Sequence, residues 1–415
     1  MRIFPTLAAV ALLLISCGRD VPDSVPVIGS SRTADSGCLW NLDSLSRVPE
    51  TRWLDEEHGV RGLYFRTADC DGRPARAFAY YSNPAMLSGR SSARASYPGI
   101  VLLHGGAGRA FREWVEKWAA EGYAAIAVDL SGNGPGGEEL PDGGPDLSDT
   151  QRVFLDAESG DMTSMWTYHA VSTAILAHSL LLSLPEVDPR RTVVTGISWG
   201  GYLTCIVASL DDRFRAAAPV YGCGFYDELE FFAYGMDPLS PAGRKNWMTH
   251  FDPSVYLPRM SIPVLFVNGN TDTAYHLFAY EKSCRLVADS LRTICIRPGM
   301  AHGYYEGWEP GEIRCFFESV LHDGYPLPRL GKAKIGADSV RVGYTPGIAL
   351  RSASFHYSND TLSRNPERHW ETIPAKVDPK RGVVTAPVPE EGVRIGFVRV
   401  EDIRGMAAST EFIVR

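Results

Sequence analysis

Residues 191–210, RTVVTGISWGGYLTCIVASL, join an apolar strand pattern to an apolar helical pattern through the short turn GISWGG at residues 196–201. A serine between glycines at such a junction predicts a sharp, strained turn that points the serine Oγ away from the sheet, with no room for side chains at the glycine positions. Because the chain contains 40 glycines, the short pattern alone arises easily by chance. The prediction of a reactive Ser198 therefore rests on the strand before the turn and the helix after it.

A reactive serine needs a base, and the base needs a carboxylate that orients it. Asp272 lies three residues past the apolar run PVLFVNG, and His302 lies three residues past the apolar run TICIRPG. Since the carboxyl ends of parallel strands meet at one edge of a sheet, these side chains are expected to lie close to Ser198. We predict a catalytic triad of these three residues. His276 is the alternative base, but it falls inside a helical pattern.

Backbone donors for a developing oxyanion are predicted in two places. The N–H of Trp199 directly follows the nucleophile, and the glycine-rich run LHGGAG at residues 103–108 follows another apolar strand. In that run Gly106 is the preferred donor and Ala107 the second. His104 is interpreted as structural, because it precedes the turn of the loop.

Aromatic side chains next to these motifs are candidates for stacking on a sugar ring, with core packing as the alternative interpretation. They are Trp199, Tyr202, Tyr304 and Trp308.

Further apolar runs alternate with helical patterns along the chain and predict a mostly parallel sheet with helices on both faces. They occupy residues 99–106, 124–130, 214–222, 263–269 and 293–299. Upstream, a hairpin is predicted around Asp71-Gly72, and residues 170–184 are predicted to form a buried helix. The glycine- and proline-rich residues 131–149 predict an irregular loop that borders the substrate site. Residues 226–258 are interpreted as a small helical cap or an ordinary connection.

Short alternating strands separated by turn sequences follow residue 328 and predict a small C-terminal β-sandwich. The predicted domain boundaries are residues 37–328 for the α/β domain with its N-terminal extension, and 329–415 for the sandwich. A packing or ligand-binding role is all that the sequence indicates for the second of these.

The N-terminal sequence predicts export. Residues 1–16 combine one arginine with a short apolar run, as a secretion signal does, and the segment LISC resembles a bacterial lipobox that ends at Cys17. We therefore predict a lipidated Cys17, a flexible tether over residues 17–36, and attachment to a bacterial membrane, with the outer membrane or cell surface favoured over the inner membrane. Seven cysteines remain after Cys17, and a Cys38–Cys70 disulfide is one option among them.

The composition narrows the possible partners. The chain is 45% hydrophobic and 22% charged, which is typical of a globular protein. It carries 41 Lys and Arg against 49 Asp and Glu, so nucleic acid is not an expected partner. No cysteine or histidine cluster has the spacing of a zinc site, and no metal or cofactor is expected.

The motifs resemble those of the α/β-hydrolase superfamily over approximately residues 62–322. GISWGGYLT is similar to the GxSxGGYxT segment of the prolyl oligopeptidase family, and PVLFVNGNTDTAYH and GMAHGYYE are similar to its acid and histidine segments. Exported acetylxylan esterases and dienelactone hydrolases share this layout. The resemblance implies an α/β-hydrolase fold with the triad roles for Ser198, Asp272 and His302. The chain has no room for the β-propeller of prolyl oligopeptidases, and a serine at position 198 argues against dienelactone hydrolase chemistry.

These features together predict a secreted serine hydrolase that cleaves short acyl, acetyl-type esters, on a small ester or an acylated carbohydrate. One alternative is a prolyl oligopeptidase-type serine peptidase with the same triad. The other is a surface glycan-binding protein on a hydrolase scaffold, which an intact triad disfavours.

Overall fold

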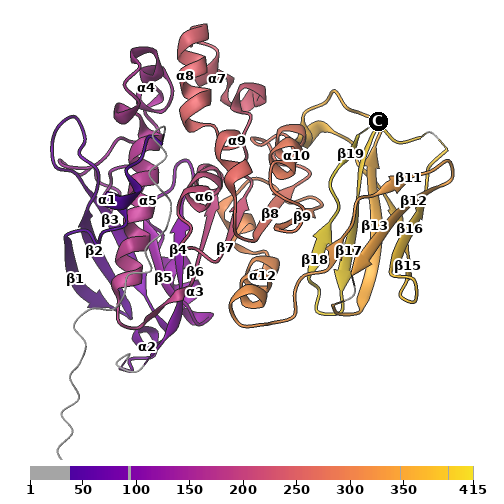
Figure 1. The fold of residues 1–415 in the computed structure, drawn as a ribbon, viewed down its shortest axis with the longest axis horizontal. Helices are drawn as coiled ribbons and strands as arrows, with labels where there is room; N and C mark the ends of the chain where they lie inside the picture. The colour runs from indigo at the N-terminus through magenta and orange to yellow at the C-terminus, as the bar shows by residue number, and fades with distance from the viewer. Residues whose placement is uncertain (1–37, 92–94, 346, 391, 415) are drawn as a thin grey trace, which may run out of the picture. The chain divides into compact units, whose positions relative to one another are not determined.

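The computed structural model describes residues 38–91, 95–345, 347–390 and 392–414 (Figure 1). The predicted signal peptide, the lipidation site at Cys17 and the tether lie outside these residues and stay predictions. All of these described residues belong to one compact unit. Within the described ranges, no helix is both long enough and apolar enough to cross a membrane.

A mixed sheet runs through this unit, and its central strands are parallel, as the sequence predicts. Its strands lie in the order β1 (Thr51–Glu57), β2 (Val60–Arg66), β3 (Arg76–Ser82), β5 (Ala124–Val128), β4 (Tyr97–Leu103), β6 (Val187–Ile197), β7 (Ala216–Val220), β8 (Val264–Gly269), β9 (Arg292–Arg297), β18 (Ala407–Ser409), β17 (Ile395–Asp402), β13 (Leu350–Ser358) and β14 (Glu371–Pro374), while β19 (Ile413–Val414) also pairs with β17.

Strands β1 to β3 are antiparallel and form the start of the sheet. Asp71 and Gly72 lie in the turn between β2 and β3 with φ angles of 51° and 70°. Asp tolerates the left-handed conformation and Gly adopts it freely, so the predicted hairpin is confirmed. Strand β5 is buried at every residue, which requires cover on both faces of the sheet.

The covering helices are α3 (Arg112–Ala120), α5 (Trp166–Ser183), α6 (Trp199–Leu210), α10 (Leu277–Arg285) and α12 (Gly311–Leu321). Helix α5 packs against α6, and α12 is tied to α3 by the Arg314–Glu121 ion pair at 2.5 Å. Helix α5 is buried almost all round, which confirms the predicted buried helix at this position. Two short helices, α1 (Leu42–Leu45) and α2 (Pro84–Leu87), lie in the N-terminal part.

Two insertions between the strands are built from short helices, and Figure 1 shows α4, α7 and α8 beside one another. The first contains α4 (Thr150–Val153), η1 (Leu155–Ser159) and η2 (Met162–Ser164); the second contains η3 (Tyr226–Glu228), η4 (Glu230–Phe232), α7 (Ala233–Met236), α8 (Pro241–Phe251), α9 (Pro253–Tyr256) and η5 (Leu257–Arg259). Residues 226–258 are therefore helical, as predicted for a cap. Residues 131–149 hold no helix or strand beyond an isolated bridge, so their irregularity is confirmed, while their place at the substrate site stays a prediction.

The residues after 328 form two facing layers. One is a smaller sheet with the strand order β10 (Arg329–Leu330), β12 (Ser339–Thr345), β16 (Val383–Pro387) and β15 (Lys376–Asp378), with β11 (Lys334–Ile335) also on β12. A separate apolar core, which includes Val342, Phe355 and Val398, lies between this sheet and strands β13 and β17. This second core accounts for the predicted β-sandwich.

One layer of the sandwich is continuous with the main sheet. Ser409 of β18 pairs with Ile294 of β9, and the Ile296 N–H donates to Ser409 Oγ at 3.0 Å. The predicted boundary at residue 328 divides the sequence, but it does not divide the sheet. Hydrogen bonds join β9, which lies before residue 328, to β18, which lies after it. The seven cysteines from Cys38 to Cys315 are free thiols among the described residues, so the Cys38–Cys70 disulfide is not formed here.

A buried histidine makes the stability of the fold depend on pH. His169 on α5 is 3% exposed, and neither ring nitrogen has a hydrogen-bond partner among the described residues. Burial, aided by the positive charge of Arg152, lowers the pKa of His169 to about 4. Because the folded state disfavours the charged ring, this stabilising contribution is complete above the unfolded pKa of about 6.5 and is lost as the pH falls toward 4.

We expect His169→Leu to remove this dependence. Between pH 7 and pH 5, the free energy of unfolding of the wild-type protein should fall by about 2 kcal/mol more than that of the variant. Urea unfolding of both proteins at the two pH values measures the difference. An equal loss in both proteins would contradict the assignment.

Candidate active site

Ser198 sits at the turn between β6 and α6 in a strained backbone conformation, with φ 60° and ψ −118°. Its N–H donates to the carbonyl of Val220 at 3.0 Å. A Cβ atom built on Gly196 would lie 2.2 Å from the Gly200 carbonyl oxygen, and one built on Gly200 would lie 1.9 Å from the Leu103 carbonyl oxygen. Both glycines are therefore required by close backbone packing, as the sequence predicts.

Asp272 and His302 lie on the loops that follow β8 and β9, and a chain of hydrogen bonds joins them to Ser198. The Ser198 Oγ lies 3.0 Å from His302 Nε2, and His302 Nδ1 lies 2.9 Å from Asp272 Oδ2. These partners are consistent with a neutral ring that donates its Nδ1–H to the carboxylate and accepts the serine proton at Nε2. The structure thus brings together the three residues predicted from the sequence.

The carboxylate of Asp272 is buried and held in one orientation. Its Oδ1 atom accepts the backbone N–H groups of Ala274 at 2.7 Å and of Tyr275 at 2.6 Å. Only Oδ2 faces the histidine ring. The loop after β8 therefore fixes which oxygen His302 meets.

Tyr221 directly follows β7 and packs against the loop that carries His302. This residue was not identified from the sequence. Its ring centroid lies 4.5 Å from that of His302, and its hydroxyl donates to the carbonyl oxygen of Ala301 at 2.8 Å. Its φ of 66° is unusual for a tyrosine and marks a constrained site. The signal that could have identified Tyr221 is its position at the end of an apolar run, like the positions of the triad residues.

The predicted oxyanion loop after β4 packs directly against the serine turn. A Cβ atom on Gly105 would lie 2.8 Å from Ser198 Cβ. The hydroxyl of Tyr304 accepts the Gly105 N–H at 3.1 Å and donates to the Gly106 carbonyl oxygen at 2.9 Å. Among the described residues, neither Gly106 nor Ala107 has an acceptor for its N–H. These N–H groups remain available for a ligand, and their role at an oxyanion stays a prediction.

The buried side chain of His104 also fixes this loop through hydrogen bonds. Its Nδ1 lies 2.8 Å from the Gly105 carbonyl oxygen, and its Nε2 accepts the Leu130 N–H at 2.8 Å. Burial lowers the pKa of His104, so the ring is neutral. Both nitrogens are occupied by backbone partners, in agreement with the structural role predicted for this residue.

Comparisons with known proteins agree with this architecture. The acetyl xylan esterase family model matches residues 73–227, and the prolyl oligopeptidase family model matches residues 161–305. The fold is similar to that of an acetyl xylan esterase from Paenibacillus sp. R4, with a TM-score of 0.53 and 19% identity over 68% of this chain and 92% of that one. Acetyl Xylan Esterase 1 from Thermoanaerobacterium sp. JW/SL YS485 gives a TM-score of 0.52 and 18% identity, over 69% of this chain and 95% of that one. The chain has an α/β-hydrolase fold.

One curated relative is named as a peptidase. The uncharacterized peptidase YuxL of Bacillus subtilis (strain 168) is 29% identical over 138 residues, which is 32% of this hydrolase. The match covers only 18% of the length of YuxL. Together with the two family models, it supports a serine hydrolase and leaves open whether the bond cleaved is an ester or a peptide bond.

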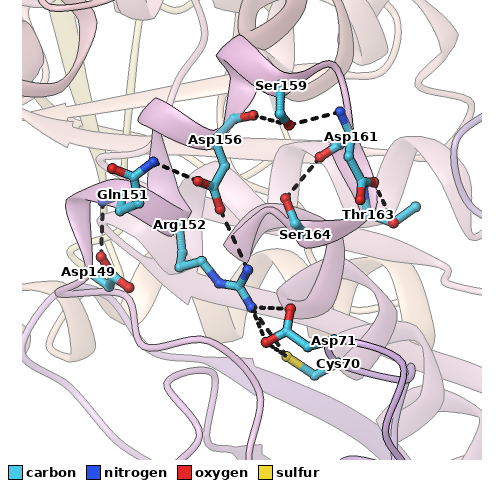
Figure 2. Close-up of polar contacts among 10 residues, drawn as sticks. All are labelled: Cys70, Asp71, Asp149, Gln151, Arg152, Asp156, Ser159, Asp161, Thr163 and Ser164. Carbon is cyan, nitrogen blue, oxygen red and sulfur yellow. Dashed lines mark hydrogen bonds and ion pairs between the residues drawn. The ribbon is translucent and has the colours of Figure 1, made fainter.

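The first helical insertion packs on the residue after the nucleophile. The Phe154 ring lies edge-on to the Trp199 ring, with 5.9 Å between their centroids. It also stacks on the ring of Trp247 in α8, with 5.5 Å between centroids. Figure 2 shows the polar contacts that anchor this insertion. Arg152 Nη2 donates to both carboxylate oxygens of Asp71 in the hairpin turn, each at 2.8 Å. The hydrolase thus has a cap of residues 149–164 and 226–259 whose aromatic side chains surround Trp199.

The structure corrects the predicted sugar-stacking role of Tyr202. This side chain is fully buried, and its hydroxyl donates to the Phe251 carbonyl oxygen at 2.7 Å, so it supports the cap from within the core. Tyr202 lies one turn into α6, a helix that is buried at every residue.

Trp308 is the last residue of α11 (Tyr304–Trp308). It stacks on Trp114 at 5.5 Å and lines a cavity of about 510 Å³ between α3 and α12, whose lining includes no triad residue. Its predicted role in stacking on a sugar ring stays a prediction. Tyr304 is partly buried, and its hydroxyl binds the oxyanion loop instead of facing open solvent.

His276, the alternative base, takes another role. It caps the N-terminus of α10, where its Nδ1 accepts the Phe278 N–H at 3.3 Å. Among the described residues, no group of three or more His, Cys, Asp or Glu side chains is arranged to hold a metal ion.

Proposed function

We propose that this hydrolase is a serine carboxylic-ester hydrolase that removes short acyl groups, of acetyl type, from a small ester or an acylated carbohydrate. The observation that carries the proposal is the hydrogen-bonded chain from Ser198 through His302 to Asp272, set at a strained turn.

The geometry supports a two-step acyl transfer. His302 Nε2 takes the Ser198 proton as Oγ attacks the ester carbonyl carbon, and Asp272 stabilises the imidazolium that forms. The N–H groups of Trp199 and Gly106 bind the oxyanion, with Ala107 as the second candidate on that loop. His302 then gives the proton to the leaving alkoxide. Water hydrolyses the acyl-enzyme by the same steps in reverse order.

Crowding near the nucleophile supports a small acyl group. Four aromatic rings lie around the Trp199 ring, each with its centroid within 5.9 Å of the Trp199 centroid: Phe154, Tyr202, Tyr226 and Phe232. The rings of Tyr221 and Tyr275 lie against His302. These are large, well-packed side chains that leave little freedom to accommodate a long acyl chain. The similarity to acetyl xylan esterases agrees with this size limit.

The proposed location follows from the N-terminal sequence. The short apolar run before Cys17 supports export and lipidation at that cysteine. We propose a lipoprotein attached to a bacterial membrane, with the outer membrane or cell surface favoured.

The experiment is acetate release from acetylated xylan by a soluble form that starts near residue 36. We expect release by the wild-type protein, and none by Ser198→Ala. The same pair of proteins is compared on p-nitrophenyl acetate, which reports on the ester chemistry without the glycan. Hydrolysis of neither substrate, with Ser198 still labelled by a fluorophosphonate, would overturn the proposed substrate class.

A peptidase is the second candidate, because the prolyl oligopeptidase family model covers the serine, the acid and the histidine motifs. Chromogenic Xaa-Pro peptides test it directly. Turnover of these peptides above that of p-nitrophenyl acetate would favour the peptidase.

A further inference from the structure

The predicted oxyanion loop, residues 104–108, must keep one conformation if its free N–H groups are to act on a ligand. Its sequence HGGAG is rich in glycine, and glycine has more backbone freedom than any other residue. Ala107 adds strain, because its φ of 54° lies in the left-handed region that alanine disfavours. A strained backbone of this kind persists only where other parts of the fold hold it. The loop therefore needs an anchor outside its own sequence.

The hydroxyl of Tyr304 is such an anchor. It accepts the Gly105 N–H at 3.1 Å and donates to the Gly106 carbonyl oxygen at 2.9 Å, so one oxygen atom holds both ends of a two-residue segment. The fit is close, since a Cβ atom built on Gly108 would lie 2.1 Å from this oxygen. Burial raises the pKa of Tyr304, so the phenol keeps the proton that it donates.

These contacts also set the directions of the free N–H groups. A trans peptide unit points its C=O and its N–H in opposite directions. The bond from Tyr304 to the Gly106 carbonyl oxygen therefore sets the direction of the Ala107 N–H, which belongs to the same peptide unit. The preceding unit is held by His104, whose Nδ1 lies 2.8 Å from the Gly105 carbonyl oxygen, and this contact sets the direction of the Gly106 N–H.

Tyr304 also connects the oxyanion loop to the loop that carries the base. It is the first residue of α11 and comes two residues after His302. Its ring packs on the ring of Phe111, with 4.7 Å between centroids, which fixes the side chain on the side away from its hydroxyl. A short stretch of chain and one hydroxyl group thus join the predicted proton acceptor to the predicted oxyanion donors.

We propose that Tyr304 is a positioning residue for oxyanion stabilisation, whose hydroxyl keeps the N–H groups of Gly106 and Ala107 in the direction in which they meet the oxyanion. The inference rests on the proposed acyl transfer. Tyr304 acts through the loop and not on the reacting atoms. Its effect is largest in the transition state, where the negative charge on the carbonyl oxygen is greatest, and small in the substrate complex.

Tyr304→Phe tests the proposal, because it removes the hydroxyl and keeps the ring that packs on Phe111. We expect kcat for p-nitrophenyl acetate to fall about 10- to 100-fold with little change in KM, which is less than the loss expected when an oxyanion donor itself is removed. Tyr305→Phe is the matched control. Tyr305 is the next residue of α11 and is 76% exposed, so water surrounds its side chain and kcat should stay within about 2-fold of wild type.

The pH profile separates a change at the oxyanion loop from a change at the base. His302 keeps its contacts with Ser198 and Asp272 in Tyr304→Phe, so the pH at which kcat/KM reaches half of its maximum should equal that of the wild-type protein. A shift of this midpoint would show that the hydroxyl acts on the base, and would overturn the proposal.

Fluorophosphonate labelling separates this proposal from the proposed substrate class, because labelling needs the active serine and no particular ester. We expect Tyr304→Phe to be labelled more slowly, by about the same factor as kcat, and to the same final extent as the wild-type protein. A merely structural role would lower the final extent, since misfolded molecules do not react. Labelling at the wild-type rate, or an equal loss of rate in Tyr305→Phe, would overturn the role of Tyr304 even if acetyl esters are hydrolysed.

Amide hydrogen exchange of the wild-type protein at single-residue resolution decides the question if Tyr304→Phe does not fold. We expect the Gly105 N–H, which is bound by the hydroxyl, to exchange slowly before labelling. The Gly106 or Ala107 N–H should become slow only after labelling, when the phosphonyl oxygen binds it. Exchange of Gly105 as fast as that of Gly106 before labelling would show that Tyr304 does not hold the loop.

Discussion

Ser198→Ala is expected to lower kcat for acetyl-ester hydrolysis by about 10⁶-fold, which is the scale seen when a serine nucleophile is removed from a triad. The reason is that His302 has no other hydroxyl within hydrogen-bonding distance among the described residues to which it acts as a base. Initial rates with p-nitrophenyl acetate measure the loss, and fluorophosphonate labelling should disappear with it. A variant that keeps more than about a hundredth of the activity would show that another nucleophile operates.

Ser198→Gly distinguishes lost chemistry from lost structure. The wild-type φ of 60° is costly for a residue with a Cβ atom and is freely adopted by glycine. We expect this variant to be as inactive as Ser198→Ala and yet to unfold at a higher temperature, by an amount that corresponds to about 1 kcal/mol. Ser198→Ala keeps the Cβ atom and should unfold close to the wild-type temperature.

Asp272→Asn is expected to lower kcat by about 10⁴-fold without loss of the fold. Two backbone N–H groups, from Ala274 and Tyr275, bind Oδ1, so the amide oxygen of asparagine keeps that position. The amide nitrogen then faces His302 Nδ1 and donates to it. The ring is forced into the tautomer with its proton on Nε2, where it can no longer accept the Ser198 proton.

The measurement is the kcat of Asp272→Asn beside the thermal unfolding midpoints of both proteins. The midpoint should change little, because the two backbone hydrogen bonds are kept. Asp272→Ala serves as the comparison, since it loses those bonds and should be both inactive and less stable. A loss below about 10-fold in Asp272→Asn would indicate that another carboxylate orients the histidine.

The triad could be predicted because each of its members follows a recognisable strand. An apolar run predicts the strand. Parallel strands end at one edge of a sheet, so the loops that follow these runs lie close together. The glycines around Ser198 add a steric requirement that can be read from the sequence. Local pattern was therefore enough for Ser198, Asp272 and His302.

The aromatic residues show where local pattern is not enough. Tyr202 and Tyr304 lie beside motifs of the site, but their directions depend on tertiary packing. The Tyr202 hydroxyl points into the core toward Phe251, and the Tyr304 hydroxyl binds Gly105, which is 199 residues away in sequence. Nothing in the residues around either tyrosine encodes these partners.

The same limit applies to the C-terminal strands. Alternating residues and turn sequences predict strands and a sandwich after residue 328, as observed. They do not indicate which strand lies next to which, so the pairing of Ser409 with Ile294 could be seen only in the structure.

That pairing bears on how the protein avoids aggregation. Strand β9 is the last parallel strand of the main sheet, and an uncovered β9 would present unpaired N–H and C=O groups along an apolar, buried-type sequence. Strand β18 covers this edge. A chain that stops near residue 328 would leave β9 open to strands of other molecules, and the pairing with β18 removes that open edge.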